Sequence, residues 1–411
     1  MKHPPADVPG WTPPAKIWNK MFLSIFFANM SMNLGQQMSN SLLSLYAKSL
    51  GAPADQIGEL MSMFAITALI FRFISGPAMN SFNRKKLVIM AISLMASAYL
   101  GFSLSPVIAG ILGLETITVL KFFRLLQGIG NAFGNSCCLT IVADVLPKDK
   151  FTAGMGYYSV AQVVSQAVGP SVGVFLRDIF GFSTTYILFF GIMLLAVGAS
   201  TLVKIAPRPS VPFKVSLNNV FAKEALVPSI VTLLVAMGFN SIGSFLLVYT
   251  EERGIAGSSL FFTVYALTML VTRPVVGNLT NKFGFVRVCI PAVLMTACSL
   301  LLIGYAPNLP VLLFAAFVNS FGYGAVRPML QSLCMKSVPP ERRGSASSTN
   351  YIFLDAATLM GPTLCGEVAA RFGYVPAMWV AMAIPVVLGA FVIFFFRKNI
   401  NQIEQGFQAA A

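Results

Sequence analysis

Twelve long apolar runs dominate this sequence, and they restrict what the chain can fold into more than any other feature. A helix needs about 20 predominantly apolar residues to cross the hydrocarbon core of a bilayer. Only 10% of the 411 residues are charged and 56% are hydrophobic, so a soluble protein of this length would lack the charged shell that covers a large core. The pattern predicts an all-α membrane protein. We expect its membrane-spanning helices near residues 20–46, 57–79, 87–105, 116–146, 152–176, 183–204, 226–249, 258–279, 286–305, 310–337, 344–369 and 375–396.

Lysine and arginine fall in alternate connections between these runs, which predicts the orientation of the chain. Cytoplasmic connections of membrane proteins carry an excess of these residues. If the first residues lie in the cytoplasm, that side receives basic clusters such as Arg84–Lys86, Lys336–Arg343 and Arg397–Lys398, whereas the other side receives isolated basic residues. We therefore expect a multi-pass protein of the bacterial inner membrane with both termini in the cytoplasm. Topology accounts for the formal net charge of +14, so no nucleic-acid partner is expected.

The second half of the chain repeats features of the first half. The pair Gly169-Pro170 recurs 192 residues later as Gly361-Pro362, and the same offset pairs Gly181 with Gly373. Repeats of this kind are typical of carriers that open their site alternately to either side of the membrane. We expect a cytoplasmic tail at 1–19, a six-helix bundle at 20–204, a cytoplasmic linker at 205–225, a second six-helix bundle at 226–398 and a cytoplasmic tail at 399–411.

The connection after the second predicted helix gives the first resemblance to a known family. Its residues Gly76, Asn80 and Arg84–Lys86 resemble the G-x-x-x-D-R-x-G-R-[KR] loop of the major facilitator superfamily, although Asn80 replaces the family's acidic residue. A second copy begins at Gly277 and continues through Asn281. The resemblance implies a cytoplasmic gate formed by Gly76, Asn80, Arg84, Gly277 and Asn281; anchoring at the cytoplasmic membrane surface is the simpler alternative for the basic cluster.

The fourth predicted helix contains an arginine within an apolar run. The stretch from Arg124 through Gln127 to Gly130 is similar to the R-x-x-Q-G-x-G stretch of the same superfamily. An arginine inside hydrocarbon is costly unless it is paired or hydrated, so it marks an aqueous cavity or a buried partner. The resemblance implies a role in proton coupling or in shaping the cavity. The alternative is an arginine whose side chain reaches the outer membrane surface.

The repeated Gly-Pro pairs predict hinges. Gly169 and Pro170 lie in a stretch that resembles the Gly/Pro-rich segment of drug:proton antiporters, and Gly361 and Pro362 repeat it in the other half. Glycine lets two helices approach closely, and proline frees a carbonyl and bends its helix. Because both halves carry the pair, ordinary helix packing is an alternative to the hinge.

Polar residues inside the apolar runs are candidates for the substrate pathway. Asn33, Gln36 and Asn40 share one face of the first predicted helix, and Asn240 occupies a related place in the other half. Amides that face lipid are costly, so this face is expected to line the cavity or to join the helix to its neighbours.

Asp355 is the one carboxylate near the middle of a predicted span, and Arg327 lies at a comparable depth in the preceding span. If the two residues form an ion pair, Asp355 stays charged and serves structure or gating. If they separate during the cycle, Asp355 is a proton carrier.

Together these features favour a transporter. The resemblance implies a major-facilitator-type bundle of twelve membrane helices in two pseudo-symmetric halves. We expect a monomer in the lipid bilayer that exports a small organic compound, either drug-like or a metabolite. Transport is expected to proceed by alternating access coupled to protons. The proton gradient would be the energy source, and no cofactor or metal is expected. An anionic metabolite, imported or exported, is the alternative, because Arg124 and Arg327 outnumber Asp355. A sensor on a transporter scaffold is a remote third, and no enzymatic motif supports an enzyme.

Overall fold

The computed structural model describes residues 16–146, 151–203, 213, 221–338 and 343–410. Within these ranges the regular structure is helical and includes no β-strand. The helices are α1 (Lys20–Ser49), α2 (Ala54–Ser81), α3 (Arg84–Leu112), α4 (Thr116–Val145), α5 (Phe151–Thr201), the short 3-10 helix η3 (Lys223–Ala225), α6 (Leu226–Glu252), α7 (Leu260–Phe283), α8 (Phe285–Tyr305), α9 (Leu309–Lys336), α10 (Arg343–Phe372), α11 (Pro376–Phe395) and α12 (Arg397–Ala410).

The expected all-α membrane architecture is confirmed. Each predicted span coincides with a helix or with one arm of α5, and α12 is an additional helix that begins two residues before the predicted C-terminal tail. Eight stretches of the described residues are long and apolar enough to cross a membrane, among them Arg84–Leu112, Lys223–Glu252 and Leu309–Lys336. Helix α1 falls below that threshold because its run of amides, from Asn29 to Asn40, lowers its hydropathy.

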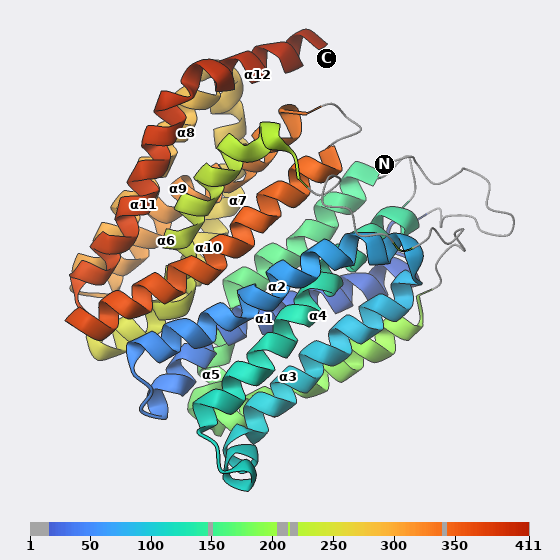
Figure 1. Ribbon diagram of the computed structural model, residues 1–411, viewed down its shortest axis with the longest axis vertical. Helices are drawn as coiled ribbons and strands as arrows, with labels where there is room; N and C mark the ends of the chain where they lie inside the picture. The colour runs from blue at the N-terminus through green and yellow to red at the C-terminus, as the bar shows by residue number, and fades with distance from the viewer. Residues whose placement is uncertain (1–15, 147–150, 204–212, 214–220, 339–342, 411) are drawn as a thin grey trace, which may run out of the picture. The chain divides into compact units, whose positions relative to one another are not determined.

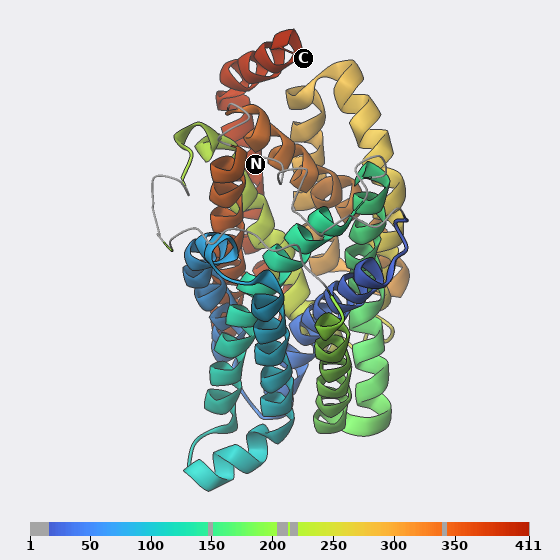
Figure 2. The same cartoon turned by 90° about the vertical axis from the view of Figure 1, so that its right-hand side faces the viewer.

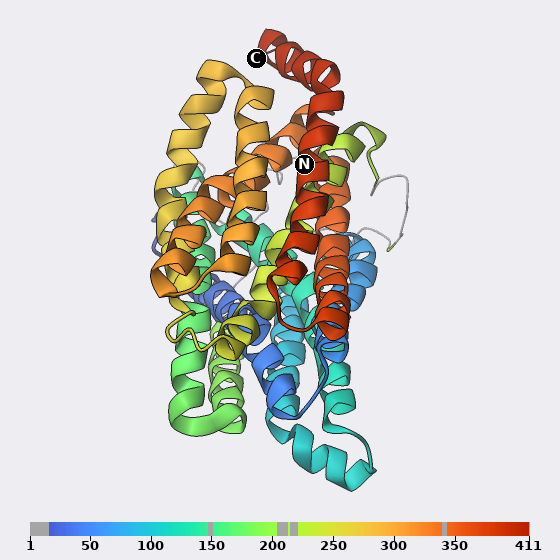
Figure 3. The ribbon, with the colours of Figure 1, turned by 90° about the vertical axis from the view of Figure 1, so that its left-hand side faces the viewer.

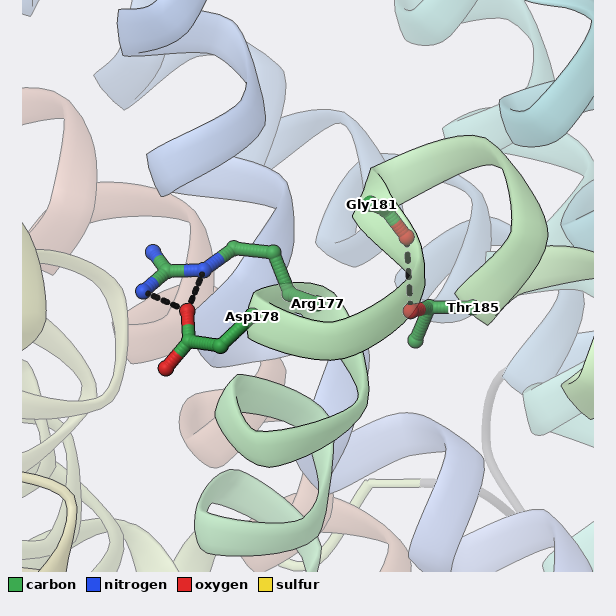
Figure 4. Close-up of polar contacts among 4 residues, drawn as sticks. All are labelled: Arg177, Asp178, Gly181 and Thr185. Atoms are coloured by element: carbon green, nitrogen blue, oxygen red, sulfur yellow. Dashed lines mark hydrogen bonds and ion pairs between the residues drawn. The ribbon is translucent and has the colours of Figure 1, made fainter.

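Helix α5 contains two predicted spans joined by a sharp bend. Gly181, at the bend, has φ 77° and ψ 171°, a conformation that residues with a Cβ rarely adopt. Figure 4 shows the contacts around the bend: the Thr185 hydroxyl donates to the Gly181 carbonyl at 2.8 Å, and Arg177 pairs with the adjacent Asp178 at 2.7 Å. The glycine therefore supplies the turn between two helical arms.

The chain divides into two compact units. The first comprises residues 1–42 and 63–215, and the second comprises residues 43–62 and 216–411. In the first unit α3 packs against α4 and α5; in the second, α6 packs against α10 and α11, and α8 packs against α9 (Figures 1, 2 and 3). The corner between α1 and α2 thus belongs to the second unit. The boundaries predicted around the linker at 205–225 stay a prediction, because most of that segment lies outside the described residues.

Candidate functional site

A buried arginine organises the polar interior of the first unit. Arg124, on α4, is 1% exposed. Its Nη2 atom donates to Oδ1 of Asn40 on α1 at 2.8 Å, and its Nη1 atom donates to Oε1 of Gln127 at 2.5 Å. The Phe64 ring of α2 covers the guanidinium, with 4.9 Å between the guanidinium carbon and the ring centroid. Three helices therefore hold this one cation.

Further hydrogen bonds extend this Arg124 cluster, which comprises Arg124, Asn40, Gln127, Phe64, Gln36 and Tyr99. Gln127 Nε2 donates to the Tyr99 hydroxyl of α3 at 3.0 Å, and Gln36 Nε2 donates to Asn40 Oδ1 at 2.9 Å. The structure thus brings together four of the residues predicted for the pathway: Gln36, Asn40, Arg124 and Gln127. Asn33 is not among them, because its amide turns back to Asn29 one helical turn earlier.

The charge of Arg124 is not balanced by a carboxylate within the described part of the chain. Its hydrogen-bond acceptors are neutral amide oxygens, and its buried Nε atom has no hydrogen-bond partner there. Oε1 of Gln36 is likewise buried without a donor among the described residues. Buried polar groups are normally satisfied, so each unpaired atom needs an explanation. Chemically, the cluster offers a cation and a free N–H donor to an anionic or acceptor group.

The second unit holds a different charged site. Arg327 on α9 is half-buried, and Asp355 on α10 is 8% exposed. The Asp355 carboxylate lies close enough to act electrostatically on the Arg327 guanidinium, as do the phenol groups of Tyr265, Tyr323 and Tyr351. The two charged residues predicted from the sequence therefore lie within electrostatic range of each other in one unit, and three tyrosines act on Arg327 as well.

Sequence reasoning missed an aromatic cluster beside Arg327, which comprises Phe239, Tyr265 and Tyr323. Phe239 of α6 stacks on Tyr323 of α9, with ring centroids 4.1 Å apart and planes 11° apart, and its centroid lies 5.2 Å from that of Tyr265 on α7. The adjacent Asn240 donates to the Thr358 hydroxyl of α10 at 2.9 Å. One signal was available: Tyr323 precedes Arg327 by four residues, and Tyr351 precedes Asp355 by four, which places each pair on one helical face.

The glycines of the predicted hinges lie at tight helix contacts inside each unit. A Cβ at Gly169 would come 2.9 Å from Gln37 Cβ on α1, and a Cβ at Gly361 would come 2.5 Å from the Met237 carbonyl oxygen on α6. Pro170 and Pro362 are buried beside them. In each half, therefore, the helix that carries the Gly-Pro pair packs closely against the first helix of that half: α5 against α1, and α10 against α6. The hinge motion itself stays a prediction.

The predicted cytoplasmic gate is described only in part. Arg84 is buried, and its Nε atom donates to the Met79 carbonyl oxygen at 3.1 Å. Gly277 is exposed, and a Cβ there would meet nothing within 4 Å. The side-chain surroundings of Gly76, Asn80 and Asn281 lie outside the described part of the chain.

No metal centre is present among the described residues, since no three His, Cys, Asp or Glu side chains group together there. The chemistry on offer is recognition and charge movement, carried by the Arg124 cluster in one unit and by Arg327, Asp355 and the aromatic cluster in the other.

Comparison with known proteins agrees with this architecture. The chain is 24% identical over 373 residues to the multi-drug resistance efflux pump PmrA of Streptococcus pneumoniae. The alignment covers 87% of this chain and 91% of PmrA. It is 23% identical over 390 residues to the uncharacterized MFS-type transporter YhhS of Escherichia coli, with 93% of each chain covered.

Solved structures share the fold. The nucleoside transporter NupG superposes with a TM-score of 0.76 at 13% identity, covering 91% of this chain and 99% of NupG. A peptide transporter POT in complex with sulfate superposes with a TM-score of 0.77 at 14% identity, covering 95% and 97%. The profile of the Major Facilitator Superfamily matches residues 25–254 and 228–407, which together span most of the chain. The protein therefore belongs to the major facilitator superfamily and is a multi-pass membrane transporter rather than an enzyme.

Proposed function

We propose that this protein exports a small organic compound from the cytoplasm in exchange for protons, by alternating access. It works as a monomer in the bacterial inner membrane with both termini in the cytoplasm, and the proton gradient drives it without a cofactor. The likeness to a multi-drug resistance efflux pump supports export over import.

The neighbouring Asp355 and Arg327 carry the proposal of proton coupling. A nearly buried carboxylate in a membrane helix is costly unless a cation or a proton neutralises it. While Asp355 is ionised, the guanidinium of Arg327 attracts it. Once a proton neutralises Asp355, this attraction is lost and the preferred arrangement of α9 and α10 changes. Proton binding thereby biases the conformation of the second unit, which is the requirement for coupling.

The aromatic cluster supports a drug-like compound that contains rings. Phe239 is only partly buried and has Tyr323 stacked at 4.1 Å, so it presents an aromatic surface next to the charged pair. Stacking on such a surface recognises the ring rather than one particular substituent. A site of this chemistry suits an exporter that accepts several related compounds.

The unbalanced charge of Arg124 favours a second candidate function, transport of an anionic metabolite. A buried guanidinium with a free Nε donor would bind a carboxylate or sulfonate through charge-assisted hydrogen bonds. On this account Arg124→Lys retains part of the transport and Arg124→Gln abolishes it. An exporter of cationic compounds would gain from losing the positive charge.

Reconstituted liposomes with an acidic interior test both functions. A pH-sensitive dye inside reports proton efflux while ring-containing cations, neutral compounds and sulfonates are added outside; sulfonates do not carry protons through lipid themselves. Acceleration by cationic or neutral compounds supports the drug-like exporter, and acceleration by sulfonates alone supports the anion transporter. If no compound in a broad panel accelerates proton efflux, proton-coupled export is contradicted.

A further inference from the structure

Helix α3 is too long for the membrane it crosses. It has 29 residues and begins at Arg84, in the basic cluster of the cytoplasmic connection. At a rise of about 1.5 Å per residue it extends about 44 Å, whereas the hydrocarbon core is roughly 30 Å thick. A span that starts at Leu87 uses about 20 residues and reaches the opposite edge near Pro106. On this placement the last turns of α3 lie beyond the hydrocarbon.

These last turns are nevertheless apolar. Residues 107–114, here called the outer corner, read Val-Ile-Ala-Gly-Ile-Leu-Gly-Leu and contain no polar side chain. Ile111 is 79% exposed and Leu112 is 60% exposed. Contiguous apolar surface of this kind facing bulk water is unfavourable, and in proteins it marks an interaction surface.

The backbone turns the outer corner out of the path of the helix. Pro106 lies inside α3, where it removes one backbone hydrogen bond, and Gly113 closes the helix with φ 66° while its N–H donates to the Ala109 carbonyl. Figures 2 and 3 show the end of α3 bending away from the axis of the preceding turns and extending beyond the bend of α5. A bend at this depth turns the apolar residues so that they run along the membrane surface instead of along the membrane normal.

The exposed face of α3 runs without interruption into the outer corner. Met90, Ser97, Leu104 and Ile111 follow one another at intervals of seven residues, and all four are exposed. Met90 and Leu104 lie at hydrocarbon depth on a helix that spans the membrane, so this face contacts lipid. Continuity along the face indicates that Ile111 contacts the same lipid nearer its headgroups.

We propose that the outer corner is an interfacial segment that lies between the headgroups and the acyl chains of the leaflet opposite Arg84–Lys86. Its partner is the lipid itself. The described charges nearest to it in the sequence are Glu115 and Lys121, with no basic residue from Leu87 to Leu120. The attachment therefore depends on burial of apolar area and not on anionic headgroups, in contrast to basic amphipathic helices. This inference is independent of the substrate and of proton coupling.

A nitroxide label at position 111 tests the proposal. The exposed Cys298 is first replaced by serine, and Ile111→Cys is labelled in nanodiscs that hold one copy each. Collision rates with oxygen, which concentrates in lipid, and with a water-soluble nickel chelate are then compared. Leu104→Cys on the same face is the hydrocarbon control, and Ala256→Cys, in the exposed connection between α6 and α7, is the water control.

We expect the label at position 111 to collide with oxygen almost as often as the label at 104, at a shallower depth, and with nickel several-fold less often than the label at 256. The result should agree between neutral and anionic nanodiscs within about a factor of two. Collision with nickel as frequent as at position 256 would overturn the proposal. The proposal would also be overturned if the label at position 111 were protected from nickel only in anionic nanodiscs.

Discussion

Arg124 donates a hydrogen bond to Asn40 at 2.8 Å, and this contact joins two helices whose partner residues are 84 positions apart in the chain. The acceptor is an amide, so the contact holds the guanidinium in place without neutralising it. A buried cation held in this way remains available to a substrate group or to a conformational change.

Replacing the amide by a carboxylate tests that view. Asn40→Asp would give Arg124 an internal ion pair, so we expect higher thermal stability of the purified protein and loss of transport of any anionic substrate. The matched control is Asn33→Asp, which adds the same charge to α1 but bonds within its own helix; it should lower stability. Equal effects of the two substitutions on melting temperature would contradict the role of Asn40.

The contact between Gly361 and Met237 makes a prediction for stability. A Cβ at Gly361 would come 2.5 Å from a backbone oxygen, which cannot move aside as a flexible side chain can. We expect Gly361→Ala to destabilise the second unit by about 1–3 kcal/mol, as overpacked cores do. Gly198→Ala on α5 is the control, because a Cβ there meets nothing within 4 Å. Thermal unfolding in detergent should show a clear loss for Gly361→Ala and little change or a gain for the control.

The aromatic cluster makes a prediction for recognition. Phe239→Ala removes the partly buried ring on which a ring-containing substrate is proposed to stack, and an aromatic stacking contact contributes about 0.5–1.5 kcal/mol beyond the area it buries. The KM for a ring-containing substrate should therefore rise roughly two- to tenfold. Phe391→Ala removes an exposed ring of α11 and should leave KM unchanged. An equal rise in both variants would mean that the effect is a general loss of packing.

Tyr374, in the connection between α10 and α11, makes a prediction for pH. Burial, the nearby Glu252 carboxylate and Cys365 together raise the pKa of Tyr374 to about 12, with burial the largest cause. Because the folded protein holds the phenol proton more tightly than the unfolded chain, the contribution to stability is complete below pH 10 and is lost as the pH rises toward 12. Tyr374→Phe should make the fall in melting temperature above pH 10 shallower. An unchanged slope would contradict this assignment.

The sequence predicted those features of the site that depend on a single helix, but not the contacts between helices that are distant along the chain. The cost of a charge in lipid marked Arg124 as a residue of either a cavity or a buried contact, and it left open a side chain that reaches the membrane surface. Depth along the helices placed Arg327 and Asp355 at a comparable level, but did not show whether they pair. The identity of Asn40 as the acceptor, and of Phe239, Tyr265 and Tyr323 as one cluster, depends on how separate helices rotate about their axes. A helix that faces lipid on one side and apolar neighbours on the other carries apolar residues all the way round. The sequence pattern therefore does not show which face of the helix points to which neighbour.

The two-helix character of α5 illustrates the same limit. The apolar runs on either side of Gly181 predicted two spans, and both exist. The positive φ of Gly181 joins them by a tight bend rather than by a separate loop, and a single glycine between apolar runs does not by itself distinguish these outcomes.

Proton flux through the Asp355→Asn variant tests the central claim most directly. In liposomes with an acidic interior, a compound that accelerates proton efflux through the wild type is compared in Asp355→Asn and in Glu367→Gln, which alters an exposed carboxylate of the same helix that pairs with Arg371. We expect Asp355→Asn to lower substrate-dependent proton efflux at least tenfold while exchange of labelled for unlabelled substrate persists, and Glu367→Gln to behave as the wild type. Wild-type proton efflux in Asp355→Asn would contradict the account.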